Sequence, residues 1–144
     1  MELQLNTSVQ RLTVAGIDVG STLAAPTWSA LTLASGMITP HSNNGYIAEY
    51  AIIAGIVHLR GAIGGEAGDY SLGGGTITLA TLPAEATPSI QRITLGVAYP
   101  EGGSNITSYG HSARINVDTS GNVKYLGQGR DATSCFLDGI SYSL

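Results

Sequence analysis

The stretch GIVHLRGAI, residues 55–63, alternates side chains with the two-residue period of a β-strand. One face carries apolar side chains that we expect in the core: Val57, Leu59 and Ile63. The other face mixes apolar and polar side chains: Ile56, His58, Arg60 and Ala62. This stretch therefore predicts a strand with one buried face and one face of mixed character.

The mixed face of this strand predicts a contact between subunits rather than a surface in water. Apolar residues flank the two polar groups, as at the margin of an interface. We therefore expect Ile56, His58 and Arg60 at a subunit interface, with Arg60 paired to an acid such as Glu49 or Asp138.

The overlapping stretch YAIIAGIV, residues 50–57, is apolar on both faces. On an exposed sheet edge such a segment would promote aggregation, so both faces need cover. Two explanations stay open: burial of the second face in an oligomer interface, or burial of the strand between two sheets.

Short β-type runs separated by Gly, Pro, Asn and Ser occur along the whole chain, and no window keeps a helical period. The expected strands are 8–14, 29–34, 46–53, 55–63, 75–81, 90–99, 112–118, 122–126 and 134–142. About nine strands with turns between them predict an all-β fold, an antiparallel sandwich or jelly-roll-like domain.

Two of these strands show their faces by alternation. In 112–118 we expect the apolar set to point inward: Ala113, Ile115 and Val117. The short loop DTSGN joins this strand to 122–126 in a hairpin. In 90–99 we expect the apolar set inward as well: Ile93, Leu95, Val97 and Tyr99. Gly96 and Ala98 would then lie outward, where small residues permit close approach of another subunit, and they join the predicted interface.

Two long glycine-rich loops, 64–75 and 100–110, combine Tyr with Gly, Ser and Asn. Recognition loops use this composition because Tyr supplies rigid contact area and its neighbours supply adaptable hydrogen bonds. The candidate recognition residues are Tyr70, Ser71, Asn105 and Tyr109. An ordinary flexible loop is the alternative in each case.

The composition excludes several classes of function. Only 11% of the 144 residues are charged, and six Lys and Arg with a net charge of -4 give no basic surface for nucleic acid. The chain contains no run of 18 apolar residues, so we expect no segment that inserts into a membrane. The single cysteine, Cys135, is expected to be a small buried apolar residue in a terminal strand.

The sequence also gives no catalytic or metal-binding pattern. His41, His58 and His111 are too widely spaced for a local metal site, and no nucleophile motif of the type GxSxG is present. We therefore predict a protein without enzymatic activity, metal or cofactor.

Five short motifs occur in an order that resembles the C-terminal head domain of bacteriophage tail-fibre and minor tail proteins. They are Trp28 with LTLASG, then GIVHLRGAI, TITLATLPAEATPS, ARINVDTSGNVKY and FLDGISYSL, which together cover residues 28–144. The positions that match are of a structural kind: Trp28, the strand 57–61, the turn at Leu82 and Pro83, and Asp138, Gly139 and Ile140.

This resemblance implies a β-rich, commonly trimeric domain of the virion whose partner is often a glycan on the host surface. Residues 1–27 are then expected to form an arm that attaches the head, 28–144, to other virion subunits such as major capsid or tail proteins. The apolar residues of the arm are the candidates for this contact: Leu3, Leu5, Val9, Leu12 and Val14. A trimeric decoration or head-fibre protein on the capsid is the first expectation, and a short tail-fibre or tail-tip receptor-binding protein is the alternative.

Overall fold

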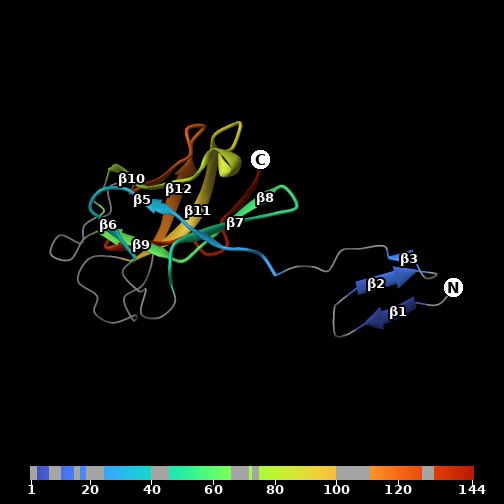
Figure 1. Ribbon diagram of the computed structural model, residues 1–144. Helices are drawn as coiled ribbons and strands as arrows, with labels where there is room; N and C mark the ends of the chain where they lie inside the picture. The colour runs from blue at the N-terminus through green and yellow to red at the C-terminus, as the bar shows by residue number, and fades with distance from the viewer. Residues whose placement is uncertain are drawn as a thin grey trace.

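The computed structural model describes residues 3–6, 11–14, 17–18, 25–39, 46–65, 72, 75–99, 111–127 and 132–144. Within these ranges the chain is all-β, and the strands of residues 28–144 form two antiparallel sheets (Figure 1). The predicted fold class is confirmed. The described residues include no helix long and apolar enough to cross a membrane.

The larger sheet has eight strands and is nearly closed on itself. In spatial order they are β5 (Thr32–Leu33), β10 (Thr76–Thr81), β13 (Asn122–Leu126), β12 (His111–Val117), β11 (Arg92–Tyr99), β14 (Ser134–Phe136), β9 (Ala62–Gly65) and β6 (Met37–Ile38). The two outermost strands, β5 and β6, are joined by a tight turn in which the Met37 amide donates to the Ala34 carbonyl at 3.0 Å. Because both edges belong to one short piece of chain, the sheet has the form of a barrel.

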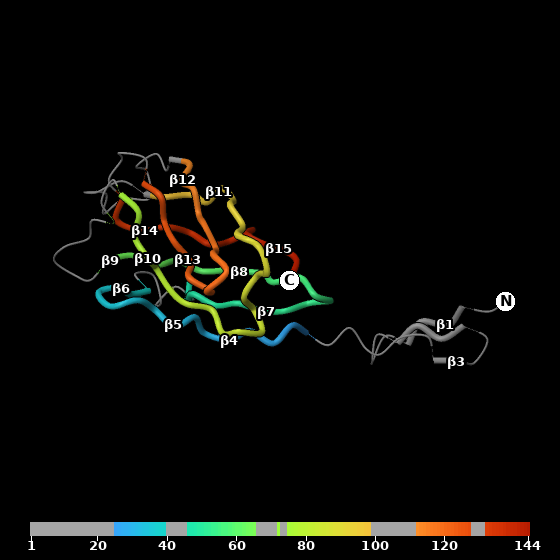
Figure 2. Tube along the Cα trace, turned by 90° about the horizontal axis from the view of Figure 1, so that it is seen from above, coloured from blue at the N-terminus to red at the C-terminus, as the bar shows by residue number. Residues whose placement is uncertain are grey.

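The smaller sheet has four strands, in the order β15 (Ser141–Ser143), β8 (Ile56–Arg60), β7 (Glu49–Ile53) and β4 (Ser29–Ala30). Seen from above, β11 and β12 lie on the opposite side of the molecule from β4 and β7 (Figure 2). The short 3₁₀ helix η2 (Ala84–Ala86) follows Pro83 in the predicted turn. Beside it, the Leu82 amide donates a hydrogen bond to the Gly121 carbonyl at 2.8 Å.

A separate sheet of three strands lies near the N-terminus: β1 (Leu3–Asn6), β2 (Arg11–Val14) and β3 (Ile17–Asp18). Its register pairs Leu3 with Val14 and Leu5 with Leu12. Among the described residues, no strand pairing joins this sheet to the other two.

Three segments predicted as continuous strands each break and change sheet. In 29–34, β4 pairs with β7 of the smaller sheet and β5 pairs with β10 of the larger one. The other two breaks lie at Gly61 and within 134–142. At Gly61 the chain leaves β8 in the smaller sheet and enters β9 in the larger one, and Gly61 has φ +89°. The segment 134–142 breaks in the same way, because β14 pairs with β9 and β15 pairs with β8. These last two breaks are bonded to each other: the Leu137 amide donates to the Gly61 carbonyl at 2.8 Å, and the Gly61 amide donates to Asp138 Oδ1 at 3.3 Å. These bends form a corner that joins the sheets.

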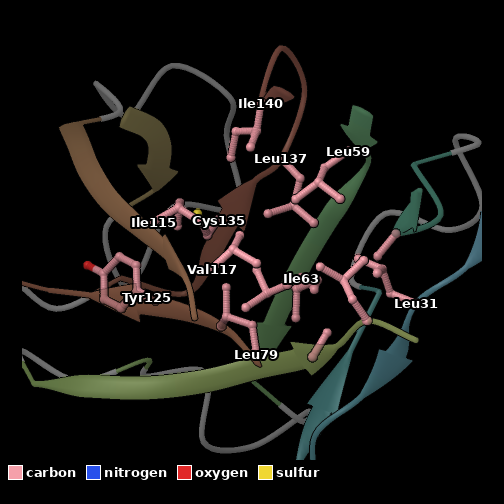
Figure 3. Close-up of a cluster of buried hydrophobic side chains, with 14 of the residues drawn as sticks. Leu31, Leu59, Ile63, Leu79, Ile115, Val117, Tyr125, Cys135, Leu137 and Ile140 are labelled. Carbon is pink, nitrogen blue, oxygen red and sulfur yellow. The ribbon is translucent and has the colours of Figure 1, made fainter. Parts of the chain in front are cut away.

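The core lies between the sheets and contains the apolar faces predicted for two segments (Figure 3). Buried residues from these faces are Val57, Leu59, Ile63, Ala113, Ile115 and Val117. Ala62, expected on the opposite face, is also fully buried. The bend at Gly61 explains this, since it carries Ala62 into the larger sheet, where it pairs with Phe136.

The facing predicted for β11 is wrong. Gly96 and Ala98 point into the core, and the apolar residues on the same strand point outward: Ile93, Leu95 and Val97. A Cβ at Gly96 would lie 3.0 Å from Ile115 Cγ1, so the inner face at this point has no room for a larger side chain. Because Gly96 and Ala98 are buried within the protomer, they cannot line a contact with another subunit, and the predicted interface role of these two residues is wrong.

The apolar stretch 50–57 forms the hairpin of β7 and β8. Ala54 and Gly55 have φ +49° and +79°, the left-handed pair of a tight two-residue hairpin turn. Val57 is buried in the core between the sheets, and Ala51 is buried on the opposite face of the hairpin, where it pairs with His58. The side chains next to the turn are exposed: Ile52, Ile53 and Ile56. Of the two explanations for this apolar stretch, burial between two sheets therefore covers only part of its side chains.

Candidate functional site

A charged cluster lies on β7 and β8, at the residues that the sequence analysis singled out. Arg60 Nε and Nη2 both donate to Glu49 Oε2, at 2.8 and 2.6 Å. The guanidinium carbon of Arg60 also lies 3.9 Å from the ring centroid of Trp28. The predicted pairing of Arg60 with Glu49 is confirmed.

This cluster mainly holds the chain before β4 against the hairpin. Exposed ion pairs contribute about 0–1 kcal/mol, and a cation over an exposed aromatic ring about 0.5–1 kcal/mol. Because Arg60 covers one face of Trp28 and bonds Glu49, both partners are engaged within the protomer. His58 lies half-buried between its strand neighbours Ala51 and Ser141.

A cleft of about 360 Å³ opens where β11 begins beside β15. Its lining comes from both sheets: Gln91, Arg92, Ile93, Thr94, Val117, Ser141, Tyr142 and Ser143. Arg92 Nη2 donates to the Ser143 carbonyl and to its Oγ, both at 3.1 Å. Among the described residues Arg92 has no carboxylate partner, and its Nε is buried without a hydrogen-bond partner.

The chemistry of this cleft suits a polar, hydroxylated ligand of small size. Its volume lies at the lower end of the range of about 300–1,000 Å³ that small-molecule sites occupy. Arginine donates in a planar fork, and the neighbouring Ser and Thr hydroxyls both donate and accept. No local sequence pattern points to these residues, because β11 and β15 are about fifty residues apart in the chain and only the fold brings them together.

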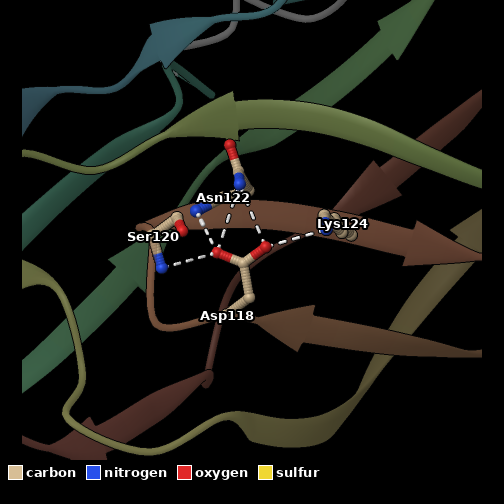
Figure 4. A network of polar contacts seen from close by, with 4 residues as sticks. All are labelled: Asp118, Ser120, Asn122 and Lys124. Atoms are coloured by element: carbon tan, nitrogen blue, oxygen red, sulfur yellow. Dashed lines mark hydrogen bonds and ion pairs between the residues drawn. The ribbon is translucent and has the colours of Figure 1, made fainter.

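The hairpin of β12 and β13 is held by a carboxylate (Figure 4). Asp118 Oδ1 accepts from the Ser120 amide at 2.9 Å and from the Asn122 amide at 3.0 Å, and Lys124 Nζ lies 2.8 Å from Oδ2. Desolvation alone would raise the pKa of Asp118, but hydrogen bonds from Lys124, Asn122 and Ser120 outweigh it and lower the pKa well below its usual value. Asp118 is therefore a structural carboxylate of the turn.

Two buried groups support the core and are poorly placed for chemistry. Cys135 is fully buried, as predicted, and burial raises the pKa of its thiol to about 12. Burial also raises the pKa of Tyr142, whose hydroxyl donates to the Ala86 carbonyl at 2.7 Å. Such a thiol is almost entirely protonated at neutral pH and is a weak nucleophile.

Several predicted site residues lie outside the described residues. These are the recognition candidates Tyr70, Ser71, Asn105 and Tyr109, together with Val9 of the arm and His41. Leu3, Leu5, Leu12 and Val14 lie on β1 and β2. The structure contains no cluster of three or more His, Cys, Asp or Glu side chains in the part of the chain that it describes. The absence of enzymatic activity stays a prediction.

The sequence matches no known family profile and no curated protein. Two solved structures have a similar fold. One is the head domain of lactococcal phage bIL170, described in a study of receptor-binding domains, with a TM-score of 0.54 and 20% identity over 83% of this chain and 99% of that one. The other is the receptor-binding protein of Listeria phage PSA, with a TM-score of 0.54 and 24% identity over 82% of this chain and 64% of that one. The chain thus resembles phage receptor-binding head domains in fold, as its motif order indicates.

Proposed function

We propose that this chain is the receptor-binding head of a bacteriophage virion protein and that it has no enzymatic activity. The supporting observation is the fold, which covers 99% of the head domain of phage bIL170. Between the two expectations from the sequence, this similarity favours the receptor-binding alternative over capsid decoration.

The proposed ligand is a glycan of the bacterial surface. Neutral, hydroxyl-rich molecules suit a chain with few charges, and they suit the Arg92 cleft with its Ser and Thr hydroxyls. The predicted recognition residues Tyr70, Ser71, Asn105 and Tyr109 would supply further contacts from the two glycine-rich loops. We further propose that the head is a homotrimer and that residues 1–27 attach it to other virion subunits.

A cell-binding experiment tests the receptor-binding function. The purified, fluorescently labelled chain is incubated with a panel of bacterial strains that includes lactococci and Listeria, and bound protein is measured by flow cytometry. We expect saturable binding to some strains and competition by their isolated cell-wall polysaccharide. Absence of binding to every strain that the phage infects would contradict the proposal.

Substitutions then assign the ligand contacts. Arg92→Ala removes the guanidinium of the cleft, and Tyr70→Ala and Tyr109→Ala remove the aromatic groups of the loops. Thr119→Ala, in the exposed turn between β12 and β13, is the matched control. At least one of the three variants should lower cell binding tenfold or more, at unchanged circular dichroism.

A localisation experiment separates the receptor-binding reading from decoration. Gold-labelled antibody against the chain should mark the tail tip of the particle in electron micrographs, whereas label spread over the capsid would favour decoration. A chain that lacks residues 1–20 should still fold and bind cells but should no longer attach to particles.

A further inference from the structure

The Arg92 cleft lies between two strand edges that pair with no other strand of the described residues. The pairing of β11 with β14 begins at Val97, so residues 92–95 pair only with β12. On the other side of the cleft, β15 is the outermost strand of the smaller sheet and pairs only with β8. The described part of the chain therefore leaves the gap between these two edges open to a molecule from outside.

The side chains at this gap combine hydroxyl groups, one guanidinium and apolar surface. Thr94, Ser141 and Ser143 supply hydroxyls that both donate and accept, whereas Arg92 supplies donors only. Ile93 supplies apolar surface and has an exposed fraction of 52%. None of the described residues that line the cleft is acidic. A sugar ring matches this mixture, because it carries hydroxyls along its edge and C–H groups on its faces.

The cleft is too small for a long stretch of polysaccharide. Its volume of about 360 Å³ is the space of about twelve water molecules, at about 30 Å³ for each. A hexose contains about as many carbon and oxygen atoms, and covalent bonds hold them closer together than separate waters. The cleft therefore has room for one or two sugar residues.

Ser143 holds the guanidinium of Arg92 at the cleft. Arg92 Nη2 donates to the Ser143 carbonyl and to Ser143 Oγ, both at 3.1 Å. Ser143 is itself held in place, because β15 pairs with β8 and the neighbouring Tyr142 hydroxyl donates to the Ala86 carbonyl at 2.7 Å. An arginine side chain that is already fixed loses less rotamer freedom when a ligand binds, so this contact lowers the cost of binding.

We propose that the Arg92 cleft binds one or two sugar residues of the host glycan, with Arg92 donating to sugar hydroxyls and Ser143 positioning the guanidinium. This inference rests on the receptor-binding function proposed above. It adds the size of the recognised unit and gives the C-terminal strand a part in recognition.

A set of variants tests the roles of the two residues. The full chain is titrated with soluble cell-wall polysaccharide from a strain that it binds, and folding is checked by circular dichroism. Arg92→Ala should raise the Kd at least about tenfold. Ser143→Ala keeps the carbonyl but loses one acceptor, and should raise the Kd about threefold to tenfold. Ser143→Thr, which restores the hydroxyl, and Ser35→Ala, in the exposed turn between β5 and β6, should stay within about twofold of the wild type.

The double variant separates positioning from a purely structural role. If Ser143 acts through Arg92, Ser143→Ala should not raise the Kd further in a chain that already carries Arg92→Ala. A general loss of structure at β15 would instead weaken binding by the same factor in both backgrounds. Equal factors in the two backgrounds would overturn the positioning role of Ser143.

Fragments of the same polysaccharide test the size of the recognised unit. Partial acid hydrolysis yields pieces of one, two and more sugar residues, and each size is used to compete with labelled polysaccharide. Pieces of one or two residues should displace the label completely at saturation. Displacement by longer pieces alone, or an Arg92→Ala protein that binds as tightly as the wild type, would overturn the inference and leave the receptor-binding function standing. A wild type that binds neither cells nor polysaccharide would overturn both.

Discussion

Replacing Gly61 with alanine should destabilise the protein more than the same replacement at any other described glycine with a positive φ. Gly61 has φ +89°, and a Cβ there would overlap the Ile47 carbonyl and lie 2.9 Å from the Ala48 nitrogen. The obstacle is backbone of the neighbouring segment, so a rotamer change cannot relieve it. The chain at the corner has to move.

The magnitude follows from two contributions. A side chain at positive φ costs about 1–2 kcal/mol. Moving the corner weakens two hydrogen bonds, from the Leu137 amide to the Gly61 carbonyl and from the Ala62 amide to the Tyr46 carbonyl. Each contributes about 1 kcal/mol. We therefore expect a loss of about 3–4 kcal/mol from a free energy of unfolding of about 5–15 kcal/mol.

Gly139→Ala is the matched control, because Gly139 has nearly the same φ, +82°, and no atom within 4 Å of an added Cβ. It should cost only the conformational part, about 1–2 kcal/mol. Urea unfolding at one fixed protomer concentration measures both variants, since oligomerisation makes stability depend on concentration. If Gly61→Ala loses no more stability than Gly139→Ala, the reasoning about the corner is wrong.

Three further predictions concern single side chains. Arg60→Ala should destabilise the fold by about 0.5–2 kcal/mol in thermal unfolding, since it removes both the Glu49 pair and the Trp28 contact. An unchanged variant would show that the cluster is dispensable. Because the pKa of Asp118 is lower in the folded protein, the stabilisation by its carboxylate is complete above the unfolded pKa of 3.8 and is lost as the pH falls toward the folded pKa. Asp118→Asn should therefore flatten the fall of the unfolding free energy below pH 4. Parallel plots of unfolding free energy against pH for the wild type and the variant would contradict this assignment. Burial raises the pKa of the Cys135 thiol to about 12, so at pH 8 it should react with a disulfide reagent about a thousandfold more slowly than a free cysteine. Unfolding in urea should remove this difference. Rapid reaction of the native protein would show that the thiol is accessible.

The positions of most strands could be predicted, because alternation and turn residues are local signals. The hairpin of 112–118 and 122–126 is an example: its apolar faces, its DTSGN loop and its pairing agree with the structure. The breaks at Gly61 and Gly139 could not be placed, since a glycine inside an alternating run is compatible with a continuous strand, and only the crossing of the two sheets requires the bend.

The facing of β11 shows a second limit. Alternation separates Gly96 and Ala98 from Ile93, Leu95 and Val97, but it does not say which set points inward. The usual preference for apolar residues in the core selected the wrong set, because Ile115 and its neighbours already fill the inner space. In the candidate site, the pair of Arg60 with Glu49 was predictable from strand neighbours, whereas the cleft at Arg92 joins segments far apart in the sequence.

From local patterns alone it follows that the chain is all-β, where most of its strands lie, and that residues 55–63 supply Val57, Leu59 and Ile63 to the core. These properties depend on the two-residue period and on turn chemistry, which act over a few residues. The bend of this stretch at Gly61 between two sheets, and the outward facing of the larger apolar side chains of β11, depend on tertiary packing. Those outcomes depend on how much volume neighbouring strands leave in a shared core, and that volume is set only when distant segments pack together.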